Sequence, residues 1–128
     1  MNSDEALIAA ARQARQNAYA PYSGFGVGAA LQTRSGRVFI GCNVENASYG
    51  LTLCAERVAV AKAVSEGERD FGAIAIVSRG AAMPCGACRQ VLAEFNADLR
   101  VIVADLEGNS HQFRLSELLP EAFSSSDL

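Results

Sequence analysis

Residues 73–104 read AIAIVSRGAAMPCGACRQVLAEFNADLRVIVA, and the order of apolar and helical segments in them predicts the fold class. Two short and mostly apolar runs, 73–78 and 99–104, enclose a segment with helical spacing at about 86–95. Neither run alternates regularly between apolar and polar residues, so we expect two strands that are buried on both faces. A strand, a helix and a second strand in this order predict parallel neighbours in one sheet, with the helix packed against it.

The flanking segments extend this unit into a larger sheet. Further strands are expected at residues 26–33, 37–41 and 111–114. Further helices are expected at residues 3–18, 54–66 and 116–119. Ser35-Gly36 supplies a turn that makes the first two strands an antiparallel hairpin. The sequence therefore predicts an α/β protein, a three-layer α/β/α sandwich around a mixed five-stranded sheet.

The composition is that of one ordinary folded domain. Half of the 128 residues are hydrophobic and a fifth are charged, and no linker, repeat or low-complexity segment interrupts the chain. We expect a single domain over residues 1–128, in which about 121–128 form a looser C-terminal tail.

Charge and the N-terminal residues restrict the partners and the location. The formal net charge is −3 and the eleven basic residues are scattered, which argues against binding to nucleic acid. The acidic start lacks the basic and apolar pattern of a secretory signal, and no apolar run has the length of a membrane span. We expect a cytoplasmic protein that does not bind membranes and acts on a small, nearly neutral ligand.

Four cysteines in a reducing compartment indicate metal binding or catalysis before disulfides. Cys85 and Cys88 form a Cys-x-x-Cys motif, which is compatible with two packing residues, a thiol redox pair or two metal ligands. Cys54 favours the metal, because a third thiolate has no use in a redox couple but completes a zinc site that keeps its fourth position for water. We expect Cys42 to be a buried packing residue and His111 a surface or packing residue.

The surroundings of the three predicted ligands, Cys54, Cys85 and Cys88, suit this chemistry. Each is expected in the first turn of a helix, where free N–H groups and the helix dipole favour thiolate. Arg57 either donates to thiolate sulfur or is a solvated helix residue, and the spacing favours neither. Glu56 can be a first-turn acid that favours the dipole. Its place beside a ligand favours a carboxylate that takes a proton from the activated water and passes one to a leaving group.

These motifs resemble a known family. Cys-Ala-Glu at 54–56 and Pro-Cys-Gly-Ala-Cys at 84–88 match the three-cysteine zinc site of the nucleobase deaminases, whose glutamate is not a ligand. The chain is more specifically similar to the small homotetrameric cytidine deaminases, from about Leu7 to Pro120. The segments that carry this similarity are residues 22–30, 41–50, 54–57 and 84–91.

The resemblance implies an activity and a cofactor. Members of this family hydrolyse cytidine and deoxycytidine to uridine and deoxyuridine, release ammonia in pyrimidine salvage, and carry one Zn²⁺ per subunit. Glu56 then corresponds to the general acid–base, and Arg57 to the arginine that offsets the thiolate charge. The resemblance also implies a homotetramer in which neighbouring subunits complete each site.

Substrate contacts follow from the same resemblance. Asn43 and Glu45 match the pair that hydrogen-bonds the ribose 3′-hydroxyl, and Phe25 matches the aromatic residue beside the pyrimidine. The backbone of Ala55 and the carbonyl of Met83 match contacts to the base and the departing ammonia. Family members usually have a small hydroxyl residue where this chain has Met83, so a side-chain contribution at that position would differ.

Three further residues match parts that act between subunits. Ala47 and Tyr49 correspond to a loop that reaches a neighbour's site. Phe123 corresponds to an aromatic residue near the C-terminus that closes the adjacent pocket, in the part of the chain where the similarity is weakest.

Three other functions are compatible with parts of this pattern. A deaminase of another aminopyrimidine, such as blasticidin S, shares the zinc motif but is disfavoured by the segment Asn43–Asn46. A non-enzymatic zinc module would need a fourth ligand, for which the sequence has no good candidate. A thiol redox protein would need neither zinc nor Cys54.

Overall fold

The computed structural model describes residues 3–128 and contains a five-stranded sheet with the strand order β2-β1-β3-β4-β5. The strands are β1 (Val27–Thr33), β2 (Val38–Cys42), β3 (Phe71–Ser78), β4 (Arg100–Ala104) and β5 (Ser110–Arg114). The helices are α1 (Ser3–Arg15), α2 (Ala55–Ser65), α3 (Gly86–Phe95) and α4 (Leu115–Leu118), with short 3₁₀ helices η1 (Tyr49–Leu51) and η2 (Ser125–Asp127).

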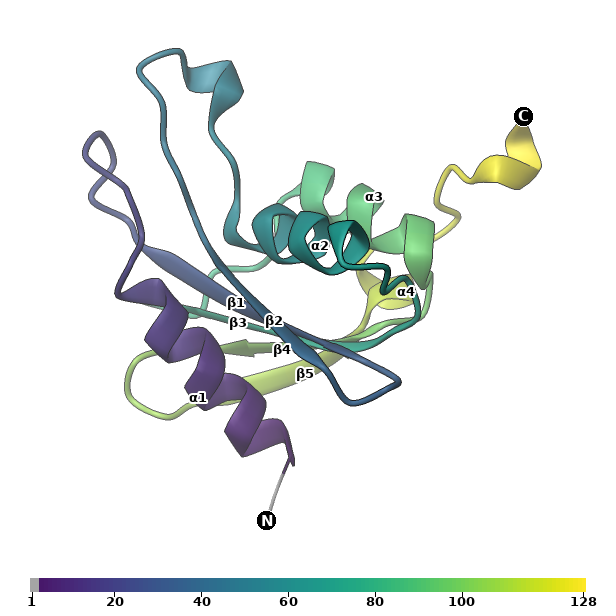
Figure 1. Ribbon diagram of the computed structural model, residues 1–128, viewed down its shortest axis with the longest axis horizontal. Helices are drawn as coiled ribbons and strands as arrows, with labels where there is room; N and C mark the ends of the chain where they lie inside the picture. The colour runs from purple at the N-terminus through teal and green to yellow at the C-terminus, as the bar shows by residue number, and fades with distance from the viewer. Residues whose placement is uncertain (1–2) are drawn as a thin grey trace.

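The sheet is mixed, as predicted. β3 and β4 pair in parallel across the α3 crossover, whereas β1–β2, β1–β3 and β4–β5 are antiparallel. Helix α1 covers one face of the sheet, and α2 and α3 cover the other (Figure 1). This arrangement confirms the predicted α/β/α sandwich. It also brings the first residues of α2 and α3 close together above one face.

Strand β3 lies at the centre of two separate cores. Ile74 and Ile76 pack with residues of α2 and α3 on one face, while Ala73, Ala75 and Val77 pack against α1 on the other. Seven of the eight residues of β3 are buried, whereas the residues of the edge strand β5 are exposed or half-buried. The prediction that this strand is buried on both faces is therefore confirmed.

Helix α1 ends at Arg15, three residues earlier than the predicted limit of 18. The chain after Arg15 leaves the helix, and the backbone of Tyr19 pairs with the segment that follows β2. Tyr19 N donates to Asn43 O at 2.9 Å, and Glu45 N donates to Tyr19 O at 2.8 Å. Backbone groups that remained in a helix could not make these two bonds. The early end of α1 therefore fixes the position of residues 43–45.

Two helices approach the sheet at glycines. A Cβ built on Gly28 would lie 2.0 Å from Ala11 O in α1, and one built on Gly41 would lie 2.5 Å from Ala55 O in α2. Such distances leave no room for a side chain, since the neighbouring atoms belong to backbone. Gly41 therefore sets how closely the first turn of α2 lies against β2.

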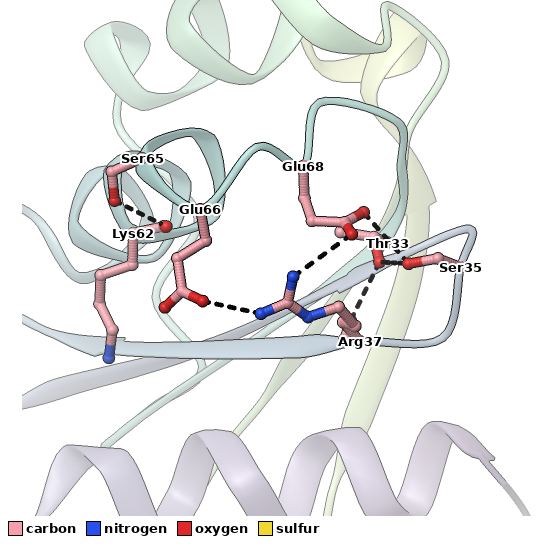
Figure 2. Close-up of polar contacts among 7 residues, drawn as sticks. All are labelled: Thr33, Ser35, Arg37, Lys62, Ser65, Glu66 and Glu68. Carbon is pink, nitrogen blue, oxygen red and sulfur yellow. Dashed lines mark hydrogen bonds and ion pairs between the residues drawn. The ribbon is translucent and has the colours of Figure 1, made fainter.

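A group of polar residues joins the β1–β2 hairpin to the end of α2 (Figure 2). Arg37 donates to Glu66 at 2.7 Å and to Glu68 at 3.4 Å, and the Ser35 hydroxyl donates to Glu68 at 3.1 Å. The side chains of Arg37 and Glu66 are about half exposed, so these contacts orient the hairpin more than they stabilise the fold.

The last residues leave the body of the protein after α4 (Figure 1). Phe123 and Leu128 are exposed there, and Gln90 Nε2 holds the Phe123 carbonyl at 2.9 Å. Within residues 3–128 no helix combines the length and the apolar character that a membrane span requires.

Replacement of Gly41 by alanine tests the close contact between β2 and α2. Gly41→Ala is expected to lower the free energy of unfolding by about 1–3 kcal/mol, because the added methyl group overlaps the backbone of α2. Gly72→Ala is the matched control, since its Cβ would meet its nearest atoms at an ordinary 3.6 Å. Chemical denaturation of both variants measures the difference. Equal stability of the two would show that α2 does not depend on this glycine.

Candidate metal centre and active site

Three of the four cysteines converge where α2 and α3 begin. Cys54 is the N-cap of α2, Cys85 is the N-cap of α3, and Cys88 lies in the first turn of α3. The Sγ atoms of Cys54 and Cys85 are 3.8 Å apart, and those of Cys85 and Cys88 are 3.5 Å apart. All three sulfurs lie within 4.8 Å of one another. The structure thus brings together the three residues that the sequence predicted as ligands.

The positions of two of these cysteines differ by one residue from the prediction. Cys54 and Cys85 stand just before the first helical turn rather than inside it. Both have extended backbones, and neither side chain makes a capping hydrogen bond. Their sulfurs are consequently directed at each other instead of at the N–H groups of their own helices, which remain a source of positive potential nearby.

The spacing of the sulfurs fits zinc. Tetrahedral zinc with bonds of about 2.3 Å to sulfur separates its sulfur ligands by about 3.8 Å. The two closest pairs, at 3.5 and 3.8 Å, have this separation already. Cys42 is half-buried in β2 and His111 is exposed on β5, and neither belongs to the group. The donor set is therefore three thiolates, which suits a zinc ion that keeps one position open.

Arg57 supplies positive charge next to the sulfurs. Its Nη2 lies 3.5 Å from Cys54 Sγ and 3.4 Å from Thr52 O. A hydrogen bond from the Cys88 thiol, assisted by Arg57, lowers the pKa of Cys54 to about 5. Donation of that hydrogen bond, together with burial, raises the pKa of Cys88. Arg57 Nε is buried and has no hydrogen-bond partner among the described residues. Because buried donors normally have an acceptor, Arg57 Nε could donate a hydrogen bond to a further group at the metal centre.

Glu56 is the second residue of α2 and is only 4 % exposed. Burial raises the pKa of its carboxyl group above the ordinary value. A carboxyl group whose pKa lies closer to neutrality can both accept and return a proton during a reaction. Glu56 therefore has the environment that a general acid–base requires.

A cavity of about 270 Å³ opens in front of Glu56, Cys54 and Cys85. Most of the residues predicted to contact substrate line it, namely Phe25, Asn43, Glu45, Ala55 and Met83. Its surface is mainly apolar, with polar groups at a few positions, which is typical of a site for a small organic ligand.

Two of the polar groups in this cavity are held in fixed orientations. Asn43 Oδ1 accepts from Val27 N at 2.9 Å, and Asn43 Nδ2 donates to Phe25 O at 2.8 Å. The Glu45 carboxylate accepts from the backbone N–H groups of Tyr22 and Ser23 at 2.9 and 3.1 Å, and also from the Ser23 hydroxyl. The bonds from Ser23 and Tyr22 lower the pKa of Glu45, so its carboxylate stays ionised.

Ala47, Tyr49 and Phe123 do not line the cavity of their own chain. Ala47 and Tyr49 lie on the loop that carries η1, which projects away from the sheet (Figure 1). Tyr49 is 76 % exposed, with its ring against that of Tyr22 at a centroid distance of 6.0 Å, and Phe123 is 59 % exposed.

Sequence reasoning assigned no role to two residues near the cavity. Ser23 orients Glu45 and also accepts from Phe25 N at 3.0 Å. Arg79 places its guanidinium 5.7 Å from the centre of the Phe25 ring. A serine before a glycine in a turn was a usable signal for the first, since such hydroxyls often bond to nearby backbone. The position of Arg79 directly after a buried strand was the only signal for the second.

Comparisons with known proteins agree with this geometry. Residues 1–104 match the family model described as the cytidine and deoxycytidylate deaminase zinc-binding region. A cytidine deaminase of Sporosarcina psychrophila is 50% identical over 97% of this chain and 93% of its own, and one of Halalkalibacterium halodurans is 54% identical over 95% of each. A crystal structure of cytidine deaminase from Burkholderia pseudomallei superposes with a TM-score of 0.92 at 52% identity, and covers 96% of this chain and 100% of that one.

The three cysteines and Glu56 lie inside the matched region, and the match extends over most of the chain. Half or more of the aligned residues are identical in relatives that cover nearly the full length of both chains. The chain therefore belongs to the cytidine and deoxycytidylate deaminase zinc-binding family.

Proposed function

We propose that this protein catalyses the zinc-dependent hydrolytic deamination of cytidine and deoxycytidine to uridine and deoxyuridine, with release of ammonia. The observation that carries the proposal is the cluster of three cysteine sulfurs, two of which line a cavity of about 270 Å³ together with the buried Glu56. Membership of the family supports it. The role in the cell would be pyrimidine salvage.

Cys54, Cys85 and Cys88 would hold the zinc ion. When bound there, zinc supplies a nucleophile near neutral pH by lowering the pKa of a water molecule. Glu56 accepts the proton that this water loses as its oxygen attacks C4 of the cytosine ring. The same carboxyl group would give this proton to the ring nitrogen, take the second proton of the former water from the new C4 hydroxyl group, and pass it to the amino group. The C4–N bond then breaks, the C4 oxygen becomes the carbonyl of the product, and ammonia leaves.

The remaining cavity residues would position the nucleoside. The Glu45 carboxylate would accept a hydrogen bond from a ribose hydroxyl, the Asn43 amide could donate one or accept one, and Phe25 would lie beside the pyrimidine. The backbone of Ala55 and the carbonyl of Met83 contact the base and the departing ammonia. Binding at the ribose, far from the reacting atom, orients C4 and so contributes to the rate.

Arg57 would act on the metal ligands rather than on the substrate. Three thiolates around Zn²⁺ sum to a net charge of about −1, which weakens the effect of the metal on a bound water. The guanidinium beside Cys54 Sγ withdraws part of that charge.

We further propose that the chain folds as a single domain over residues 1–128 and acts in the cytoplasm as a homotetramer. In this assembly Ala47 and Tyr49 reach a neighbouring site, and Phe123 closes an adjacent pocket. The large exposed side chains of Tyr49, Leu51 and Phe123 support a partner surface, because a monomer would leave them in water.

Two cysteine variants test the metal and the activity in one experiment. Wild-type protein is expected to contain one zinc per chain and to convert cytidine and deoxycytidine, followed as a loss of ultraviolet absorbance. Cys85→Ala should lose both zinc and turnover, because two thiolates cannot hold the ion tightly. Cys42→Ala is the control and should keep both, since Cys42 lies outside the cluster. Full zinc occupancy in Cys85→Ala would contradict the ligand set, and no turnover by zinc-loaded wild type would contradict the activity.

Glu56→Gln separates the proton transfer from the binding of zinc. The variant is expected to keep its zinc and its fold but to lose about 10²- to 10⁴-fold in kcat, the range typical of a lost general acid–base. Glu94→Gln on the exposed side of α3 is the matched control and should turn over normally. Normal turnover by Glu56→Gln would end the assignment of Glu56 as the proton carrier.

The tetramer is tested by the mass of the protein in solution. Light scattering coupled to gel filtration is expected to give about four times the chain mass of 13.5 kDa. Replacement of Tyr49 by serine at the exposed loop should weaken the assembly while the monomer fold persists. A monomer mass for wild-type protein at micromolar concentration would refute the proposed assembly.

A further inference from the structure

Arg89 follows the last predicted zinc ligand, Cys88, and its side chain makes two hydrogen bonds in different directions. Its Nε donates to Pro84 O at 2.8 Å, on the turn that precedes Cys85. Its Nη1 donates to Leu118 O at 2.8 Å, at the end of α4. One guanidinium therefore joins the turn that carries two metal ligands to the C-terminal segment.

The contact with Pro84 fixes the peptide group next to Cys85. Pro84 is fully buried, and a buried carbonyl needs a hydrogen-bond partner. The following carbonyl, Cys85 O, accepts from Arg89 N at 3.0 Å as the first bond of α3. Backbone and side chain of Arg89 thus hold two consecutive carbonyls, one on each side of the Cys85 Cα. The direction of the Cys85 side chain is set by these two peptide planes.

The contact with Leu118 fixes the guanidinium itself. Leu118 is the last residue of the four-residue helix α4, where carbonyl groups lack partners within the helix. A cation at this end of a helix is favourable, and the planar guanidinium can donate in two directions at once. The next residue, Gln90, holds the same C-terminal segment through Phe123 O at 2.9 Å.

We propose that Arg89 is a positioning residue for the metal centre, which uses α4 as a fixed support to hold the Cys85–Cys88 turn at zinc-binding spacing. The proposal rests on the zinc site described under the proposed function. The proposed role of Arg89 is distinct from that of the zinc ligands. The two side-chain hydrogen bonds of Arg89 go to backbone carbonyls and not to sulfur, so Arg89 acts on the ligands only through the backbone of the turn.

Arg89→Lys tests the proposal, because a single ammonium group cannot donate to both carbonyls in the geometry of a guanidinium. Zinc affinity is measured by competition with a chromophoric chelator, and Co²⁺ substitution reports the thiolate ligand geometry through its absorption spectrum. Arg89→Lys is expected to bind zinc about tenfold more weakly, as is typical when a group that orients metal ligands is lost. Its cobalt spectrum should shift, and kcat for cytidine should fall more than KM changes.

Arg100→Lys is the matched control. Arg100 also donates from two nitrogen atoms, to Asp4 at 2.9 and 3.1 Å, but at the α1 face of the sheet. This variant should keep the wild-type zinc affinity and cobalt spectrum. Thermal unfolding of the metal-free forms records the purely structural effect of each substitution. Arg89→Gln, whose shorter amide can reach only one carbonyl, serves as a second variant and should change the metal readouts in the same direction.

The outcomes separate this inference from the proposed function. Wild-type protein without zinc binding would overturn both. Wild-type protein that binds zinc, together with Arg89 variants that match it in affinity and cobalt spectrum, would overturn only the positioning role. If both Arg89 variants fail to fold, Arg89 is a structural residue and the proposal is likewise overturned.

Discussion

Three sulfur atoms within 4.8 Å of one another can all be anionic only where positive potential surrounds them, and the rest of the structure meets this constraint. The chain crosses the sheet so that α2 and α3 both begin at the same place, each with a cysteine at its N-cap. Two helix dipoles and Arg57 then act on one small volume. The parallel pairing of β3 and β4 matters here because the α3 crossover that it requires returns to the same face as α2.

Much of the fold followed from local patterns. The run of small and branched residues in β3 identified a strand buried on both faces, and the helix expected at about 86–95 agrees with α3, which is Gly86–Phe95. The end of α1 was wrong because helical spacing in residues 16–18 cannot reveal that Tyr19 pairs with Asn43 and Glu45, which lie far along the chain. Pairings of this kind depend on the tertiary structure, and a single sequence does not contain a local signal for them.

The candidate site likewise contains some residues that local sequence patterns predicted and others that only the folded structure shows. Cys54, Cys85, Cys88 and Glu56 were predicted from residue type and spacing, because few other arrangements of three thiolates and a carboxylate have a use. The roles of Asn43 and Phe25 came only through resemblance to a family. Ser23 and Arg89 received no role, since their contacts are with backbone carbonyls and a carboxylate that become neighbours only after folding.

The amide of Asn43 bonds to Val27 N and Phe25 O, so it closes the start of β1 as well as facing the cavity. Replacement of Asn43 would therefore change the wall of the cavity and also loosen the start of the strand β1. Glu45 is less constrained, because its partners are in an exposed turn. Substitutions that reshape the cavity would accordingly destabilise the fold at Asn43, and would be tolerated better at Glu45 and in the turn around Ser23.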